Sequence, residues 1–302
     1  MFFTILSLVG ASTVLYVLWA LFKFGRHFLA PSALPRYLHG DAWALVTGAS
    51  DGIGAALVDE LAQRGFNVVL HGRNASKLDK YVAQLQAKHP RRQFRTVILD
   101  AKAATAPEIE DLANKMPKNL TVLINNVAAA GDEKKFARFL DKSVASIGRI
   151  MAVNEGFPTM LTRALLPQLI ANQPALVINV GSVADKWPVV CLEEYGAGKA
   201  HNRAFSLALR KCMEVENYDV EVMHLRVTSV STPGSEEPVS FGTVTPQVFA
   251  KGALDRVGCR EGTSFGCLRH AVMVGLAETL IPDANQVMGN MGTRMMKAKL
   301  GS

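Results

Sequence analysis

Cysteine is scarce in this sequence, and its spacing argues against two common kinds of structural site. Only 4 of the 302 residues are cysteine. Their positions, 191, 212, 259 and 267, fit neither a zinc site nor a dense disulfide framework. The even count still allows pairing, although reduced thiols in a cytosol-facing domain are the simpler interpretation. No histidine has a carboxylate or second histidine at ligand spacing, so no metal site is predicted.

Charge is missing from the N-terminus. No charged side chain occurs from Met1 to Phe22, and a helix needs roughly 20 apolar residues to cross a bilayer core. Lys23 and Arg26 follow, which is the order expected of an anchor whose C-terminal flank stays cytoplasmic. A cleaved signal peptide would normally begin with basic residues, and a buried soluble helix is a further alternative. We therefore predict a transmembrane anchor over 1–22, a juxtamembrane linker over 23–41 and one α/β domain over 42–302.

Features of a nucleic-acid-binding protein are also lacking. The chain has 33 Lys and Arg against 26 Asp and Glu, a formal net charge of +7, but the basic residues are scattered and form no stripe interleaved with aromatics. The positive balance instead suits a phosphorylated cofactor or an acidic membrane face. No internal repeat is evident, and with 49% hydrophobic residues a chain of this length can bury one sizeable core.

From residue 42 to 225, apolar runs of strand length alternate with stretches that have apolar residues at helical spacing. The predicted strands are Ala42–Val46, Asn67–Leu70, Phe94–Leu99, Leu120–Ile124, Ala175–Val180 and Val220–Leu225. The predicted helices are Ile53–Arg64, Ser76–Lys88, Pro107–Met116, Ser146–Leu169 and Tyr195–Val215. Strands separated by helices pair in parallel through right-handed crossovers. We predict an α/β fold: a Rossmann-type doubly wound parallel sheet flanked by helices, preceded by a transmembrane helix.

The sequence after Leu225 has a less clear secondary-structure pattern. Phe265–Pro282 is apolar, but Arg269, His270 and Glu278 interrupt it. We interpret this segment as an amphipathic or packed helix rather than as a second membrane span.

A glycine-rich turn follows the first predicted strand and opens the first helix. Residues 47–54 read T-G-A-S-D-G-I-G. Gly48 permits a tight turn, Gly52 lets the backbone approach a pyrophosphate, and Gly54 permits close helix packing. Ser50 also belongs to this predicted phosphate-binding turn. The helix that begins near Ile53 offers the unpaired N–H groups of its N-terminus to the anion. Glycines alone are weak evidence, but their place between strand and helix favours a phosphate-binding turn.

The second strand lacks the terminal carboxylate with which NAD sites bind the ribose hydroxyls. It runs instead into Arg73, which can bind a 2′-phosphate, so NADP(H) is the predicted cofactor. A merely solvated arginine is the alternative. Asp100, at the end of the third strand, is a candidate for the adenine amino group. Asn126, at the end of the fourth, is a candidate cofactor contact, although both residue types are also common in caps and turns.

A tyrosine, a lysine and a serine form the predicted catalytic set. Lys199 follows Tyr195 by one helical turn, so both project from the same helix face. The phenol of tyrosine has a pKa of about 10, and a nearby cation lowers that pKa toward neutral pH. The pair alone could be a surface contact on a helix. Ser182, however, stands at the carboxyl edge of the fifth strand, where ligands bind in such sheets.

These motifs together resemble the short-chain dehydrogenase/reductase family over roughly residues 42–232. The resemblance implies that Tyr195 is the general acid/base, that Lys199 lowers its pKa and binds the nicotinamide ribose, and that Ser182 binds the substrate carbonyl. It also implies that Asn154 supports a water-linked proton relay. Further cofactor contacts are implied near Ile53, at Val230 and at Thr232.

Within the family, the apolar N-terminus, the glycine turn, Asn125-Asn126-Val127 and Arg73 look most like the microsomal 17β-hydroxysteroid dehydrogenase and very-long-chain 3-oxoacyl-CoA reductase branch. That similarity implies NADPH-dependent reduction of a lipophilic ketone: a 3-oxoacyl-CoA, a steroid, or a polyketide or terpenoid intermediate. It also implies a single-pass protein of the endoplasmic reticulum membrane with a cytosolic domain. The alternatives are a lumenal alcohol dehydrogenase and an NADPH-binding scaffold or sensor without turnover. The small residues 196–198 would permit a homodimer.

Two positions depart from the family pattern. Ala128 stands where the family usually has glycine, and Val227-Thr228 replaces a Pro-Gly turn. The first adds a methyl group where backbone normally approaches the cofactor, and the second alters the loop covering the nicotinamide. These departures motivate the scaffold alternative. The terminal Leu300-Gly301-Ser302 lacks the dilysine retrieval signal of some relatives, so residence in the endoplasmic reticulum is inferred from the anchor and the resemblance.

Overall fold

The computed structural model describes residues 2–132, 137–187, 189–235, 237–259, 261–281, 283, 286–287 and 289–290. The end of the predicted domain, including Leu300-Gly301-Ser302, lies outside these residues. The described α-helices are α1 (Phe2–Leu29), α2 (Gly52–Gln63), α3 (Ala75–Lys88), α4 (Ala106–Asn114), α5 (Val144–Met151), α6 (Phe157–Ala171), α7 (Glu193–Val215), α8 (Pro246–Asp255) and α9 (Leu268–Leu280). The described strands are β1 (Trp43–Thr47), β2 (Asn67–Gly72), β3 (Phe94–Ile98), β4 (Leu120–Asn125), β5 (Ala175–Val180), β6 (Val220–Arg226), β7 (Ser229–Val230), β8 (Thr243–Val244) and β9 (Thr263–Phe265).

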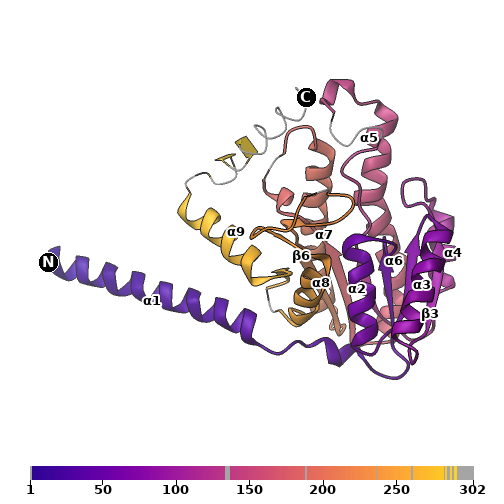
Figure 1. Ribbon diagram of the computed structural model, residues 1–302. Coiled ribbons are helices and arrows are strands. Elements are labelled where there is room, and N and C mark those ends of the chain that lie inside the picture. Colours follow the sequence, from indigo (N-terminus) through magenta and orange to yellow (C-terminus); the bar gives the residue numbers. More distant parts are fainter. Residues whose placement is uncertain are drawn as a thin grey trace.

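Seven strands form one parallel sheet in the order β3-β2-β1-β4-β5-β6-β9, with helices on both faces (Figure 1). Strands β1 to β3 are added toward one edge of the sheet and β4 to β6 toward the other. This change of order between β1 and β4 creates a crevice at the carboxyl edge, where such sheets bind ligands. The predicted doubly wound α/β fold is therefore confirmed. The strands β7 and β8 form a separate parallel pair.

Side chains on alternate positions of each strand enter two different cores, because successive residues of a strand point to opposite faces. In β1, Ala44 and Val46 face a core that includes α2, α3 and α8. Leu45 instead faces a core that includes α4 and α6. All residues of β1, β2, β4 and β5 are buried, which is the pattern expected of central strands with both faces covered.

The N-terminal helix α1 extends away from the domain (Figure 1). Among the described residues, its Phe3–Leu29 segment is the one stretch long and apolar enough to cross a membrane, and none of it is buried. The segment predicted as a linker is ordered. Lys23–Leu29 completes α1, and a 3-10 helix follows at Leu34–Tyr37. The side chains of Leu34 and Tyr37 belong to the core, so the segment that follows α1 joins the domain through packed contacts.

The helix predicted over Ser146–Leu169 is divided into α5, a π-helical turn at Ala152–Gly156, and α6. Pro158 explains the irregularity, because it has no N–H to donate to the carbonyl of residue 154 four positions earlier. Such wide turns are frequent at functional sites. The predicted packed helix in Phe265–Pro282 corresponds to α9, while Pro282 itself lies outside the described residues.

Candidate active site

The glycine turn joins β1 to α2 in a conformation that requires glycine. Gly48 has a φ of +65° and Gly52 a φ of +53°, values that side-chain-bearing residues rarely adopt. A Cβ atom on Gly54 would lie 2.1 Å from the carbonyl oxygen of Gly48. The side chain of Asp51 caps α2 by accepting a hydrogen bond from the Gly52 N–H, at 2.7 Å. The turn is thus compact enough to bring the N-terminus of α2 to the sheet edge.

Asn126 holds this turn against the end of β4. Its Nδ2 donates to the carbonyl oxygen of Thr47 at 2.9 Å, and its backbone N–H donates to Thr47 Oγ1 at 2.9 Å. The Val127 N–H also donates to Thr47 Oγ1, at 3.1 Å. Asn126, predicted as a cofactor contact, therefore shapes the glycine turn from the neighbouring strand, and Thr47, which the sequence did not single out, is its partner.

A cavity of about 360 Å³ lies over the carboxyl edge of β1, β2 and β3. Its lining includes four of the predicted cofactor residues, Gly48, Ser50, Arg73 and Asp100. It also includes His71, for which the sequence predicted no metal-binding role. The His71 ring is buried, stacks on Phe157 with centroids 5.1 Å apart, and has no hydrogen-bond partner for either nitrogen among the described residues. A narrow, partly polar cavity beside a glycine turn fits the adenosine end of a dinucleotide.

Charged groups surround the rim of this cavity. The Arg73 side chain is exposed. Asp132, which also lines the cavity, accepts hydrogen bonds from Lys102 and from Arg149, the latter at 2.6 Å. The Lys102 ammonium and then the Arg149 guanidinium hold the pKa of the Asp132 carboxyl below its usual range. Asp132 is thus already paired with cations, and β2 ends without a carboxylate beside Arg73.

The segment after β6 returns to the glycine turn. A Cβ on Gly52 would lie 3.1 Å from Thr232 Cγ2, so Thr232 directly contacts the turn. Val230 is buried in β7, and Ile53 is partly buried in the first turn of α2. The structure therefore brings these three predicted residues together at one end of the crevice.

Ser182 follows the end of β5 and caps a short 3-10 helix at Val183–Asp185. Its buried Oγ accepts a hydrogen bond from the Ala184 N–H at 3.2 Å, which leaves the hydroxyl proton available to a partner. Tyr195, in the first turn of α7, is hydrogen-bonded to Ser182. Burial raises the pKa of the Tyr195 phenol, while the bond to Ser182 acts in the opposite direction. The lowering by Lys199 that the resemblance implies stays a prediction.

Lys199 is buried one turn after Tyr195. Its Nζ donates to the carbonyl oxygen of Val180 at 2.8 Å and lies 5.5 Å from the centroid of the Tyr195 ring. Burial lowers the pKa of this ammonium to about 8, since a low-dielectric site disfavours the charged form. The Lys199 side chain is thus fixed between the end of β5 and the ring of Tyr195.

Asn154 lies in the π-helical turn, and its side chain forms hydrogen bonds with the segment after β4. Its Oδ1 accepts from the Ala129 N–H at 2.9 Å, and its Nδ2 donates to the Ala129 carbonyl oxygen at 2.8 Å. A Cβ on Gly198 would lie 2.8 Å from the Cβ of Asn154. Gly198, predicted to aid packing between two copies, therefore allows α7 to approach Asn154 within one chain. The side chain of Asn154 is committed to Ala129, and its part in a proton relay stays a prediction.

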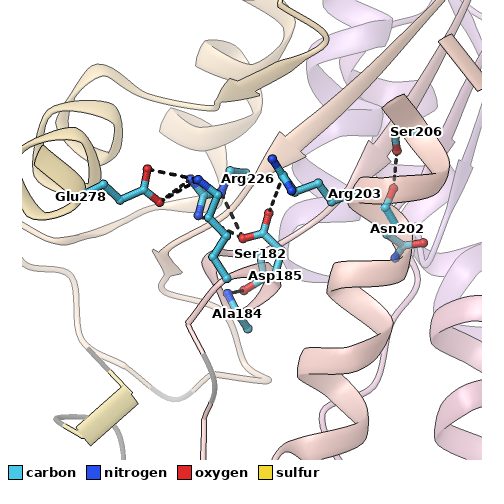
Figure 2. A network of polar contacts seen from close by, with 9 residues as sticks. Ser182, Ala184, Asp185, Asn202, Arg203, Ser206, Arg226 and Glu278 are labelled. Atoms are coloured by element: carbon cyan, nitrogen blue, oxygen red, sulfur yellow. Dashed lines mark hydrogen bonds and ion pairs between the residues drawn. The ribbon is translucent and has the colours of Figure 1, made fainter. Parts of the chain in front are cut away.

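A buried ion-pair network lies behind the serine loop, and the sequence did not reveal it. Arg226, at the end of β6, contacts Asp185 at 3.0 Å and Glu278 of α9 at 3.2 Å. Arg203 of α7 approaches Asp185 at 3.7 Å. Figure 2 shows Arg226 between the two carboxylates, close to Ser182. One buried guanidinium therefore connects the serine loop with α9.

His224 is a second buried group beside the catalytic set. A Cβ on Gly181 would lie 2.0 Å from His224 Nε2, so the ring packs directly under the backbone that leads to Ser182. Burial, followed by the charges of Lys199 and Arg226, lowers the pKa of His224 to about 3. A neutral imidazole next to Lys199 adds no further positive charge.

Metal ligands do not gather in the part of the chain that the structure describes, where no cluster of three or more His, Cys, Asp or Glu side chains could hold an ion. All four cysteines are free thiols.

A nucleotide-binding crevice beside a Ser-Tyr-Lys set on a doubly wound sheet defines an oxidoreductase of the α/β class. The family model for short chain dehydrogenases matches residues 42–240. The chain is also 33% identical over 294 residues to a very-long-chain 3-oxooacyl-coA reductase of Caenorhabditis elegans, which covers 95% of this chain and 92% of that protein. The protein belongs to the short-chain dehydrogenase family.

Other relatives have related names. A very-long-chain 3-oxoacyl-CoA reductase of Danio rerio is 28% identical and covers 98% of this chain and 91% of its own. A putative steroid dehydrogenase of C. elegans is 29% identical over 91% of this chain and 88% of its own. Among solved structures, a short-chain dehydrogenase from Sphingobium yanoikuyae in complex with NADPH has a TM-score of 0.65 at 23% identity, over 80% of this chain and 96% of that one. That likeness shows the fold.

Proposed function

We propose that this protein is an NADPH-dependent reductase of a lipophilic ketone, held at a membrane by α1. The observation that carries the proposal is the placement of Ser182, Tyr195 and Lys199 at the carboxyl edge of the sheet. Ser182 follows β5 and the glycine turn follows β1, and only β4 separates these two strands in the sheet.

The choice of NADP(H) is supported by the end of β2. Arg73 faces the cavity and β2 ends without a carboxylate that would repel a 2′-phosphate. The glycine turn would hold the pyrophosphate, and Asp100 and His71 would lie near the adenosine. A short-chain oxidoreductase solved in complex with NADP is 26% identical to this chain, with a TM-score of 0.59 over 70% of this chain and 88% of that one. When bound, NADPH supplies the hydride.

The chain's own residues supply the proton and polarise the carbonyl group of the ketone. The Ser182 hydroxyl proton, which is free of the bond to Ala184, orients the carbonyl oxygen of the ketone. Tyr195 donates its phenolic proton to that oxygen as charge develops on it. Lys199 stabilises the phenolate left behind, since it is fixed against the tyrosine ring. The carbonyl of Asn154, freed by Pro158, would bind a water that returns a proton through Lys199.

A bulky lipophilic substrate is supported by the names of the relatives, which include very-long-chain 3-oxoacyl-CoA reductases and steroid dehydrogenases. The apolar helix α1 supports delivery of that substrate from a membrane. We place the protein in the endoplasmic reticulum membrane with its domain in the cytosol. Protease digestion of sealed microsomes tests the side: a domain that is digested from outside is cytosolic, and a protected one is lumenal.

Turnover by membranes that contain the full chain tests the activity. NADPH oxidation is measured with a panel of long-chain 3-oxoacyl-CoA, steroid and other lipophilic ketones. Tyr195→Phe keeps the ring but removes the acid, and should lower kcat by about 10²–10⁴-fold while leaving NADPH affinity intact. Tyr218→Phe, at an exposed position after α7, is the matched control. Equal turnover by wild type and Tyr195→Phe would refute the assigned mechanism.

A second candidate is an NADPH-binding membrane scaffold without turnover. Ala128 favours it, because its methyl group belongs to the lining of the cofactor cavity where the family usually has glycine. NADPH binding by fluorescence, with no reduction of any ketone in the panel, would support the scaffold. Reduction of a single ketone would remove it.

A further inference from the structure

The outer face of α9 has a continuous stripe of large apolar side chains. Leu268, Val272, Leu276 and Leu280 follow one another at intervals of four residues, so they lie on one side of the helix. Their exposed fractions are 50%, 39%, 54% and 69%. Single exposed leucines are ordinary on a protein surface, but a contiguous patch marks a surface that meets an apolar partner.

The inner face of α9 is fixed to the domain, which makes the direction of the stripe well defined. His270, Ala271 and Val274 are buried, and His270 Nε2 lies 3.2 Å from the carbonyl oxygen of Gly242. Glu278 turns inward to Arg226 and Lys186 (Figure 2). The only carboxylate of α9 is therefore neutralised on the inner side, and the outer stripe carries no negative charge.

The base of α1 is anchored close to the start of α9. His27 Nε2 lies 2.8 Å from Ser264 Oγ in β9, and Lys23 forms an ion pair with Glu261 at 2.8 Å. Arg256 donates to the carbonyl oxygen of His27 at 3.0 Å. β9 ends at Phe265, and α9 begins at Leu268. The two helices are thus joined through one short strand, and both project from the same side of the domain (Figure 1).

The length of α1 places this junction at the membrane surface. Its 28 residues span about 42 Å, whereas the hydrocarbon core is about 30 Å thick. The charged turn that begins at Lys23 would therefore lie among the lipid headgroups. Trp19 supports this level, because Lys23 Nζ lies 4.7 Å from its ring centroid and aromatic residues concentrate at membrane interfaces. The contacts with Ser264 and Glu261 then hold the neighbouring α9 at the same surface.

We propose that the outer face of α9 lies in the lipid surface and forms a second, shallow membrane contact beside the spanning helix α1. The proposal rests on the anchoring role of α1 in the proposed function. A lipid surface is the occupant that these observations favour, because the contacts of His27 with Ser264 and of Lys23 with Glu261 hold the start of α9 beside the base of the apolar helix α1. Since the inner face of α9 touches Gly242 and Arg226, this contact would also place the loops of the active site against the bilayer from which a lipophilic ketone arrives.

Nitroxide labels on the full chain in phospholipid vesicles test the contact. The exposed Cys212 and the partly exposed Cys267 are first replaced by serine. Labels are then attached at Leu276→Cys and Leu280→Cys, with Val14→Cys in the apolar part of α1 as the membrane reference. Leu140→Cys, 93% exposed and outside both helices, is the aqueous control. Electron paramagnetic resonance saturation compares collisions with oxygen, which concentrates in lipid, and with a water-soluble nickel chelate.

We expect positions 276 and 280 to resemble position 14, with oxygen collisions exceeding nickel collisions, and position 140 to show the reverse. Nickel access at 276 and 280 together with oxygen preference at 14 would overturn the α9 contact and leave the anchor intact. Exclusion of both reagents at 276 and 280 would also overturn it, because a protein surface such as a second copy would then cover the stripe. Nickel access at position 14 would refute the anchor itself.

Discussion

The nucleotide-binding half of the domain and the part that follows β6 are built on different principles. In the first half, β1, β2, β4 and β5 are fully buried, and Thr47 and Asn126 satisfy one another at the sheet edge. After β6, the strands have only two or three residues, and α9 exposes an apolar stripe. The polar groups at the sheet edge of the first half pair with one another. The second part is held by a few charged contacts and, in our proposal, by the lipid surface that α9 contacts.

The largest effect is expected in the ion-pair network in which Asp185 binds Arg226 and Arg226 binds Glu278 of the second region. Asp185→Asn keeps the shape of the side chain but removes the charge opposite Arg226, whose side chain is 4% exposed. Removing one partner of a buried pair typically costs about 3–5 kcal/mol, and the free energy of unfolding in denaturant should fall by the lower end of that range, because Glu278 still pairs with Arg226. Asp111→Asn, which breaks an exposed pair with Lys115 on α4, is the matched control and should cost about 0.5 kcal/mol or less. Equal losses for the two variants would contradict the asymmetry between the regions.

Acid should destabilise the sheet through two buried histidines, His71 in β2 and His224 in β6. Burial lowers the pKa of His71 from 6.5 to about 4 and that of His224 to about 3. Between pH 6.5 and about 4 the unfolded chain takes up protons that the folded protein does not, so stability falls as the pH falls. For His71 the loss is on the order of 3 kcal/mol. Urea unfolding at pH 7 and pH 5 should show about 2 kcal/mol of it.

Leucine variants assign that pH dependence to a region. His71→Leu should flatten the dependence through the nucleotide-binding half, and His224→Leu should flatten it beneath the serine loop. If the slope is the same in wild type and in both variants, neither imidazole is the buried neutral group that the structure shows.

The sequence predicted the first half well, because each of its signals is local. The range of β5 matches the prediction residue for residue, and the glycine turn lies where its spacing placed it. The π-helical turn was missed even though Pro158 marks it, because the apolar periodicity continues across the break. Asp185 and Arg226 are 41 residues apart, and no local pattern connects them. β7, β8 and β9 are too short to show a strand period.

The smallest effect is expected at the rim of the cofactor cavity, where the first half depends on a single exposed side chain. Arg73→Ala removes the cation proposed to bind the 2′-phosphate, and a charge-assisted hydrogen bond contributes about 1.5–3 kcal/mol. The Kd of NADPH, measured by fluorescence, should rise about 10- to 100-fold, with the lower end favoured because Arg73 is exposed. The Kd of NADH should not change. Arg91→Ala, an exposed arginine beyond α3 and outside the cavity lining, should affect neither cofactor. An equal loss of affinity for NADPH and NADH would mean that Arg73 positions the adenosine that both cofactors share rather than recognising the 2′-phosphate of NADPH.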